Sequence, residues 1–111
     1  MSDCVFCKIV AGEIPSKKAY EDEQVLAFYD IEPKAPVHIL VIPKQHLAGA
    51  AEITAENSAV VAHVFEVIAR LTRGLGLADY RVVTNNGADA GQTVHHLHFH
   101  VLAGGRLGEM A

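Results

Sequence analysis

The sequence has no tryptophan, few other aromatic residues and only two cysteines. Cys4 and Cys7 are three positions apart, too close to close a useful structural loop, so the pair indicates either half of a metal site or redox chemistry. The apolar runs are also short, since residues 39–42 fall far below the roughly 18 residues that cross a bilayer. The N-terminus lacks the basic and then apolar order of a signal peptide. These absences predict a cytoplasmic protein with no membrane partner.

Basic residues are scarce too, with 9 Lys and Arg against 13 Asp and Glu and a net charge of -4. They are scattered, so no cationic stripe is available for a nucleic-acid duplex, whereas one anionic small ligand needs only a local positive field. Hydrophobic residues, in contrast, make up 50% of the 111 positions, enough for one core. No repeat or linker divides the chain, so residues 1–111 are predicted to form a single domain.

The apolar pattern predicts a mixed fold. A short helix is expected at residues 5–10, because apolar residues recur there at helical spacing before Pro15. A long helix is predicted from Thr54, a good N-cap, to Gly74 and Gly76. Its apolar positions are Val61, Val64, Phe65, Ile68, Leu71 and Leu75.

Strands are expected in five places, at residues 18–22, 24–30, 38–43, 80–84 and 94–102. Residues 85–92 are rich in Asn and Gly and are predicted to form a loop whose backbone donors can wrap a ligand. Five strands and one main helix predict an α+β domain with the helix on one face of the sheet.

Four of the seven histidines lie within residues 95–100, HHLHFH. Alternate side chains of a strand share a face, so His96, His98 and His100 are predicted to point one way. The intervening apolar residues would then point into the core. His95, at the edge of the core-side register, completes the four.

Three such imidazoles cannot share one metal ion on a regular strand. Neighbours on one face are about 6.7 Å apart and the outer pair about 13 Å, whereas Zn–N bonds are about 2.0–2.1 Å. At least one histidine is therefore free for acid–base or nucleophilic work near neutral pH. His63, isolated on the polar face of the long helix, is instead predicted to be simply solvated.

Residues 96–102, HLHFHVL, resemble the signature of the histidine triad family, or HIT family. The likeness extends in order over about residues 4–106, through CVFCKI at 4–9, GEIP at 12–15, FYDI at 28–31, HILVIPKQH at 38–46, NNG at 85–87 and GQTV at 91–94. The sequence is similar to the bacterial-type nucleotide-binding branch. The resemblance implies a five-stranded antiparallel sheet with one long and one short N-terminal helix, pairing into a homodimer with a continuous sheet.

The resemblance further implies a hydrolase without an organic cofactor, in which His98 attacks the α-phosphorus of a purine nucleotide and forms a nucleotidyl intermediate. His100 and His38 would line the phosphate site, with Asn85, Gln92 and Thr93 donating hydrogen bonds to phosphoryl oxygens or the leaving group. Asp30 would accept from the ribose hydroxyls. The apolar slot for the purine would consist of Val5, Phe6, Ile9, Phe28 and Ile31. Taken alone, most of these apolar residues indicate core, and Asp30 a turn.

Some members similar to this chain carry a structural zinc, and the corresponding ligands here are Cys4, Cys7, His46 and His96. Two sulfurs and two nitrogens suit tetrahedral zinc. Unmetallated cysteines remain an alternative, whereas a thioredoxin-like redox pair would follow a strand, and only three residues precede Cys4. Because four protein ligands leave no open position, the metal is predicted to stabilise the fold rather than act as a Lewis acid.

The sequence gives mixed indications of which leaving group the enzyme would release from the nucleotide. Residues 104–106, GGR, are similar to the phosphoramidase branch, whereas Thr93 is similar to the branch that hydrolyses dinucleoside polyphosphates. We favour a purine nucleoside phosphoramidase, with the polyphosphate hydrolase second. A nucleotide-binding regulatory module with incidental turnover remains open. A redox-metal enzyme is disfavoured by the histidine spacing and by the lack of a carboxylate near the histidines.

Overall fold

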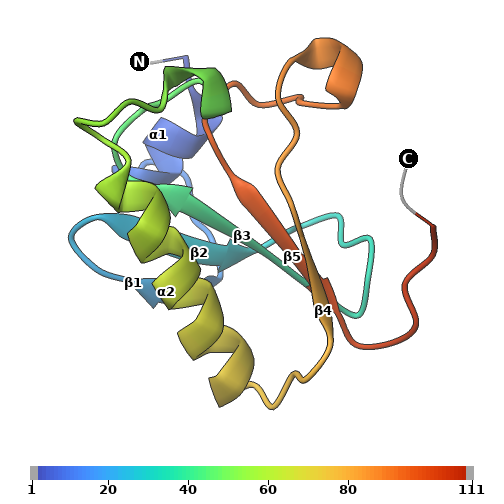
Figure 1. The fold of residues 1–111 in the computed structure, drawn as a ribbon. Helices are drawn as coiled ribbons and strands as arrows, with labels where there is room; N and C mark the ends of the chain where they lie inside the picture. The colour runs from blue at the N-terminus through green and yellow to red at the C-terminus, as the bar shows by residue number, and fades with distance from the viewer. Residues whose placement is uncertain (1–2, 110–111) are drawn as a thin grey trace.

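The computed structural model describes residues 3–109 and contains one five-stranded antiparallel sheet with two α-helices (Figure 1). In chain order the elements are α1 (Val5–Val10), β1 (Lys18–Glu21), β2 (Val25–Tyr29), β3 (Val37–Pro43), α2 (Ala59–Gly74), β4 (Tyr80–Val83) and β5 (Phe99–Ala103). Two short 3-10 turns, Ala50–Glu52 and Ala88–Ala90, lie in the loops. The strand order is β1-β2-β3-β5-β4. The predicted α+β class and five antiparallel strands are confirmed.

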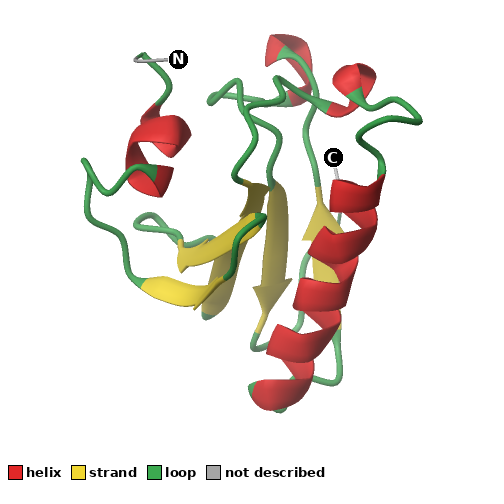
Figure 2. Ribbon diagram, turned by 90° about the vertical axis from the view of Figure 1, so that its left-hand side faces the viewer, coloured by secondary structure: helices red, strands yellow, loops and turns green. Residues whose placement is uncertain are grey.

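β2 and β3, which lie side by side in the sheet, are buried on both faces. Val25, Ala27, Ile39 and Val41 pack toward α2, and the alternate residues of β2 and β3 pack toward α1. This explains why these strands are almost continuously apolar rather than alternating. Figure 2 shows α2 along one side of the sheet and α1 on the other. The face that carries α1 is only partly covered, and this is where the histidines lie.

The long helix differs from its prediction in two ways. It begins at Ala59, because Thr54 starts a separate turn in which its carbonyl accepts from Asn57 and Ser58. Its buried stripe runs through Val60, Val64, Val67, Ile68 and Thr72. Phe65 and Leu75, expected on the apolar face, are 47% and 46% exposed because they lie at the edge of that stripe. Among residues 3–109, no helix combines the length and apolarity that a membrane crossing requires.

Candidate functional site

Most of the histidine row lies before β5, because the strand predicted over residues 94–102 begins only at Phe99. Only His100 lies within β5, and the preceding residues form an irregular segment in which the Leu97 amide donates to the Leu47 carbonyl at 2.6 Å. Leu97, Phe99 and Val101 pack in the core under α2, as predicted. His98 and His100 lie against each other, with ring centroids 5.0 Å apart. His96 turns away from them toward the two cysteines.

A backbone carbonyl sets the tautomer of His98. Its Nδ1 lies 2.6 Å from the carbonyl oxygen of His96, and a carbonyl oxygen can only accept. Nδ1 therefore carries the proton, and Nε2 keeps its lone pair. Burial lowers the pKa of His98, which favours the neutral ring. His98 is thus held as a neutral imidazole with one unprotonated nitrogen.

A second chain of hydrogen bonds orients His38 and His100. The backbone N–H of Lys34 donates to His38 Nδ1 at 3.0 Å, which places the His38 proton on Nε2. That Nε2–H donates to His100 Nδ1 at 2.9 Å. His100 must then carry its own proton on Nε2. Burial, with the neighbouring His98 and His38 rings, lowers the pKa of His100 to about 4, and burial also lowers that of His38. Both rings are neutral near pH 7 and act as hydrogen-bond donors.

Two cavities meet at these histidines. The more polar one, of about 440 Å³, is lined in part by Lys34, His38 and Asn85. The more apolar one, of about 340 Å³, contains all five residues of the expected purine slot, namely Val5, Phe6, Ile9, Phe28 and Ile31. The residues that line both cavities are Asp30, Glu32, Thr93, His98 and His100. A ligand spanning the two cavities would therefore pass directly over His98.

Gln92 is the expected site residue that lines neither cavity. Its side chain is buried, and its Nε2 donates to the carbonyls of Ala48 and Val94 at 2.7 and 3.1 Å. Its Oε1 accepts from the Gly87 amide at 2.8 Å. Both amide protons are thus used within the protein, and these hydrogen bonds brace the loop that carries Thr93. Glutamine in a Gly-rich loop gives no sequence signal for this role.

Several lining residues were not expected from the sequence, and two of them are charged. Glu32 lines both cavities, and Lys34 lines the polar cavity and contributes a backbone donor. Both lie in the short irregular segment between β2 and β3, where no periodic pattern exists to assign a face. Asp30, at the start of that segment, was singled out only through the family resemblance.

Asp30 places a carboxylate beside the histidines, contrary to the expectation that none lies there. Its Oδ2 is 3.5 Å from His38 Nε2, and together with His100 these side chains could in principle surround a cation. The Lys34 N–H argues against this use. Because it occupies the His38 Nδ1 lone pair, the neutral ring keeps its proton on Nε2, the nitrogen that would have to bind the metal.

The four expected zinc ligands, Cys4, Cys7, His46 and His96, do converge. Their donor atoms lie within 4.8 Å of one another. His96 Nε2 donates to the Pro43 carbonyl at 2.8 Å, which leaves its Nδ1 unprotonated and facing the cluster. Cys4 caps α1 and Cys7 lies within it, His46 lies in the segment after β3, and His96 lies in the segment before β5, so the cluster joins three parts of the chain.

The spacing of these donors fits a tetrahedral metal. Bond lengths of about 2.3 Å to sulfur and 2.0–2.1 Å to nitrogen require S···N edges of about 3.6 Å and an N···N edge of about 3.3 Å. His96 Nδ1 is 3.4 Å from Cys4 Sγ, 3.6 Å from Cys7 Sγ and 3.2 Å from His46 Nδ1. Cys7 Sγ lies 3.2 Å from His46 Nδ1. The residues present therefore fit a zinc ion in donor type and in geometry.

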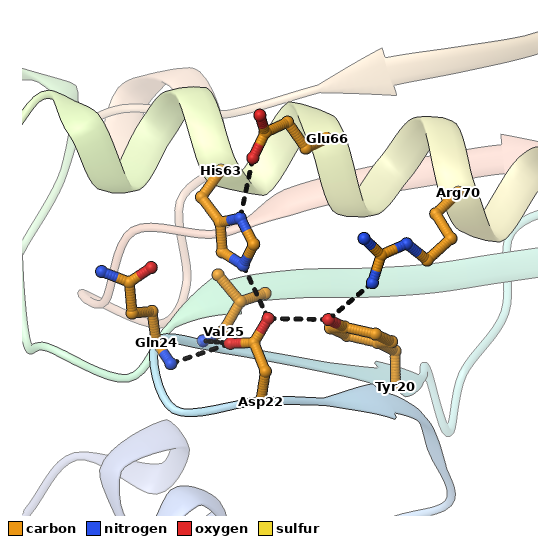
Figure 3. Close-up of polar contacts among 7 residues, drawn as sticks. All are labelled: Tyr20, Asp22, Gln24, Val25, His63, Glu66 and Arg70. Atoms are coloured by element: carbon orange, nitrogen blue, oxygen red, sulfur yellow. Dashed lines mark hydrogen bonds and ion pairs between the residues drawn. The ribbon is translucent and has the colours of Figure 1, made fainter.

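His63 is not simply solvated, so that prediction was wrong. Its Nε2 donates to Asp22 Oδ2 at 2.6 Å, and its Nδ1 donates to Glu66 Oε1 at 2.9 Å (Figure 3). Tyr20 donates to the same Asp22 oxygen and accepts from Arg70, so the turn between β1 and β2 is tied to α2. The helical pattern could not show this, because Asp22 lies 41 residues away in sequence.

Comparison with known proteins agrees with this geometry. The family model described as the HIT domain matches residues 11–107. An uncharacterized HIT-like protein of Helicobacter pylori is 50% identical over 101 residues, covering 90% of this chain and 95% of that protein. One from Synechococcus elongatus is 48% identical over 106 residues, covering 95% and 93%. The solved structure of a HIT family hydrolase from Clostridium thermocellum has a TM-score of 0.95 at 46% identity and covers 99% of this chain and 97% of its own. The chain therefore belongs to the HIT domain family.

Proposed function

We propose that this chain is a hydrolase of purine nucleoside phosphoramidates, with His98 as the nucleophile. Membership of the HIT family and the likeness to a solved HIT family hydrolase support the broader class, a nucleotide hydrolase or nucleotidyl transferase. The observation that carries the proposal is the His98 ring, which keeps a lone pair on Nε2 where two cavities meet. A neutral imidazole in that state attacks phosphorus without first losing a proton from the attacking nitrogen.

The proposed reaction has two displacements. In the first, His98 Nε2 bonds to the α-phosphorus while the P–N bond of the substrate breaks. The amine leaves with the electron pair and takes up a proton. In the second, a water oxygen bonds to phosphorus, the P–Nε2 bond breaks, and its electron pair returns to His98. The proton that water releases balances the one taken up earlier, and the products are a nucleoside monophosphate and an amine.

Neighbouring groups would stabilise the charges of this sequence. While the nucleotide is attached, the His98 ring is cationic, and its Nδ1–H bond to the His96 carbonyl strengthens. His100 has its Nε2–H free to donate to a phosphoryl oxygen, because its Nδ1 is occupied by His38. Thr93 and Asn85, which line the polar cavity, would add further donors.

The two cavities suggest which way the substrate lies. The purine would occupy the apolar cavity, where Ile31 is 95% exposed and free to cover the ring, and Asp30 would accept from the ribose hydroxyls. The leaving group would then enter the polar cavity, which presents the carboxylates of Asp30 and Glu32 beside one lysine. That charge balance favours an amine over the second, anionic nucleotide of a dinucleoside polyphosphate.

We further propose that zinc is held by Cys4, Cys7, His46 and His96 and has a structural role. The donor spacing and the His96 tautomer support this assignment. With four protein ligands it would supply stability rather than a site for substrate. Metal analysis of purified protein checks the proposal, and a content well below one zinc per chain after supplementation contradicts it.

Two copies of the chain are proposed to pair along β4. This strand lies at one end of the sheet, and Tyr80 on it is 40% exposed, in the same part of the molecule as the partly exposed Leu75 after α2. Antiparallel pairing of two such strands would continue the sheet across the dimer. Size-exclusion chromatography with light scattering tests the pairing, and a clean monomer at micromolar concentration rejects it.

The function is tested by incubating the protein with adenosine 5′-phosphoramidate and, separately, with a diadenosine polyphosphate. We expect AMP release from the phosphoramidate by the wild type and none by His98→Ala, with AMP binding by the variant as the control for folding. Preferential cleavage of the polyphosphate would assign the second branch of the family. If both proteins bind AMP and neither releases product, a nucleotide-binding module replaces the enzyme.

A further inference from the structure

We infer that the Cys4, Cys7, His46 and His96 cluster positions the nucleophile, so that its assembly keeps His98 in the tautomer that can attack. The inference rests on the proposed function for its catalytic consequence, but its structural part can be measured without turnover. It goes beyond stabilising the fold, because it connects the cluster to the His98 ring through two separate contacts.

The first contact is the His96 residue itself. Its ring belongs to the cluster and is completely buried, with Nδ1 facing the sulfurs and Nε2–H bonded to the Pro43 carbonyl. The backbone carbonyl of this same residue accepts the Nδ1–H of His98 at 2.6 Å. The His96 ring is thus restrained at both of its nitrogens. The carbonyl of His96 in turn determines which nitrogen of His98 carries the proton. A hydrogen-bond acceptor at one ring nitrogen of a histidine fixes the orientation of the ring and leaves the other nitrogen without a proton.

The second contact is Phe6, which lies between the two cysteines on α1. Its ring meets the His98 ring edge to face at a centroid distance of 5.1 Å, and it also touches His96 and Phe28. α1 has only six residues, too few to be stable without tertiary contacts. Its anchors are the apolar residues Phe6 and Ile9 and the two cysteines of the cluster.

Opening the cluster would therefore loosen both sides of His98 at once. The His96 peptide would lose the restraint of its own side chain, and Phe6 would be free to move with α1. If the His98 ring turns away from the His96 carbonyl, the hydrogen bond that favours a proton on Nδ1 is lost. A proton on Nε2 would block attack, because that nitrogen is the proposed nucleophile.

The decisive measurement is the tautomer of His98, followed through the 15N signals of the imidazole nitrogens, with His98→Asn used to assign them. Wild-type protein would be studied with one equivalent of Zn²⁺, after chelation, and after Zn²⁺ is added back, with circular dichroism recording the fold. We expect a single Nδ1–H tautomer with Zn²⁺, a mixture without it and recovery on re-addition. Turnover of adenosine 5′-phosphoramidate should fall about 10-fold on metal removal.

Variants separate positioning from general stability. Cys7→Ser removes one ligand and should reproduce the chelated state even when Zn²⁺ is added. His63→Gln is the matched control, because it breaks a contact between α2 and the turn after β1 that involves none of the cluster residues, and it should lower the melting temperature without changing the His98 signals. If chelated, folded wild-type protein keeps the Nδ1–H tautomer, the inference is wrong. If the tautomer changes but no nucleotide is ever cleaved, the proposed function fails while the positioning stands.

Discussion

The imidazole of His63 and the carboxylate of Asp22 form the shortest contact between α2 and the turn that joins β1 to β2. The second nitrogen of His63 donates to Glu66, so both ring nitrogens carry protons and the ring is cationic. These two carboxylates raise the pKa of His63, and His63 with two backbone amides holds the pKa of Asp22 far below its usual range. The free energy of unfolding therefore depends on pH in two separate ranges, one where His63 loses its proton and one, far more acidic, where Asp22 gains one.

Replacing His63 with Gln should reduce stability by about 1 kcal/mol near pH 6, the usual size of a partly exposed charged contact. Because the folded pKa of His63 lies above its unfolded value of 6.5, the contribution is complete below pH 6.5 and is lost as the pH rises through the folded value. Melting curves of wild type and variant should thus converge toward high pH. A difference that stays constant from pH 6 to pH 9 would show that the charge is not involved.

The pH dependence of turnover is the second prediction. The site uses neutral rings at His38 and His100, whose pKa values are lowered by burial, that of His100 to about 4. Protonating His100 Nδ1 would remove the acceptor for His38, so activity should fall as the pH drops through these lowered values. We expect kcat/KM for the phosphoramidate to stay level from pH 8 to pH 6.5 and to decline only below that. An acid limb centred above pH 6.5 would contradict the burial argument.

The strands and helices could be predicted from their apolar patterns, periodic in the helices and continuous in the buried strands β2 and β3. β3 was expected at residues 38–43 and occupies Val37–Pro43, since its apolar run is bounded by prolines. β5 was predicted from residue 94 but begins at Phe99, because the amide of Leu97 bonds to Leu47 outside the sheet and no local pattern encodes that partner. The face of α2 was misjudged at Phe65 for a related reason, since only the sheet decides where the buried stripe ends.

For the site, the residue types were visible but their roles were set by distant backbone groups. The histidine row followed from strand alternation and the expected purine slot from the family resemblance, and the two cavities are lined by His98, His100 and all five residues of that slot. The tautomers of His38, His96 and His98 depend on Lys34 N–H, the Pro43 carbonyl and the His96 carbonyl. Backbone carbonyls are the same in every residue, and so are backbone N–H groups outside proline, so a sequence cannot show which of them meets an imidazole.

Gln92 provides the third prediction. Gln92→Glu keeps the acceptor for the Gly87 amide but replaces two donors with oxygen, so a buried carboxylate would face the carbonyls of Ala48 and Val94. We expect a loss of about 1–3 kcal/mol in stability, the cost of leaving buried polar groups unpaired. Turnover should fall as well, because Thr93 follows directly in the chain. Denaturant unfolding together with phosphoramidate kinetics measures both effects. An unchanged kcat in a destabilised variant would show that Gln92 does not position the loop that carries Thr93.

The last prediction compares two neighbouring glycines at the end of β5. Gly104 has a φ of 101°, a backbone conformation that residues other than glycine rarely adopt. A Cβ at this position would lie 2.8 Å from Pro36 Cβ. Gly104→Ala should therefore cost about 1–3 kcal/mol through strain and overlap. It should also reduce turnover, because Pro36 precedes the strand that carries His38. Gly105→Ala is the matched control, since nothing lies within 4 Å of the point that its Cβ would occupy, and it should leave both the melting temperature and kcat/KM close to wild type. Equal effects of the two substitutions would mean that stability and turnover depend on the flexibility of the segment after β5 and not on the close approach of Gly104 to Pro36.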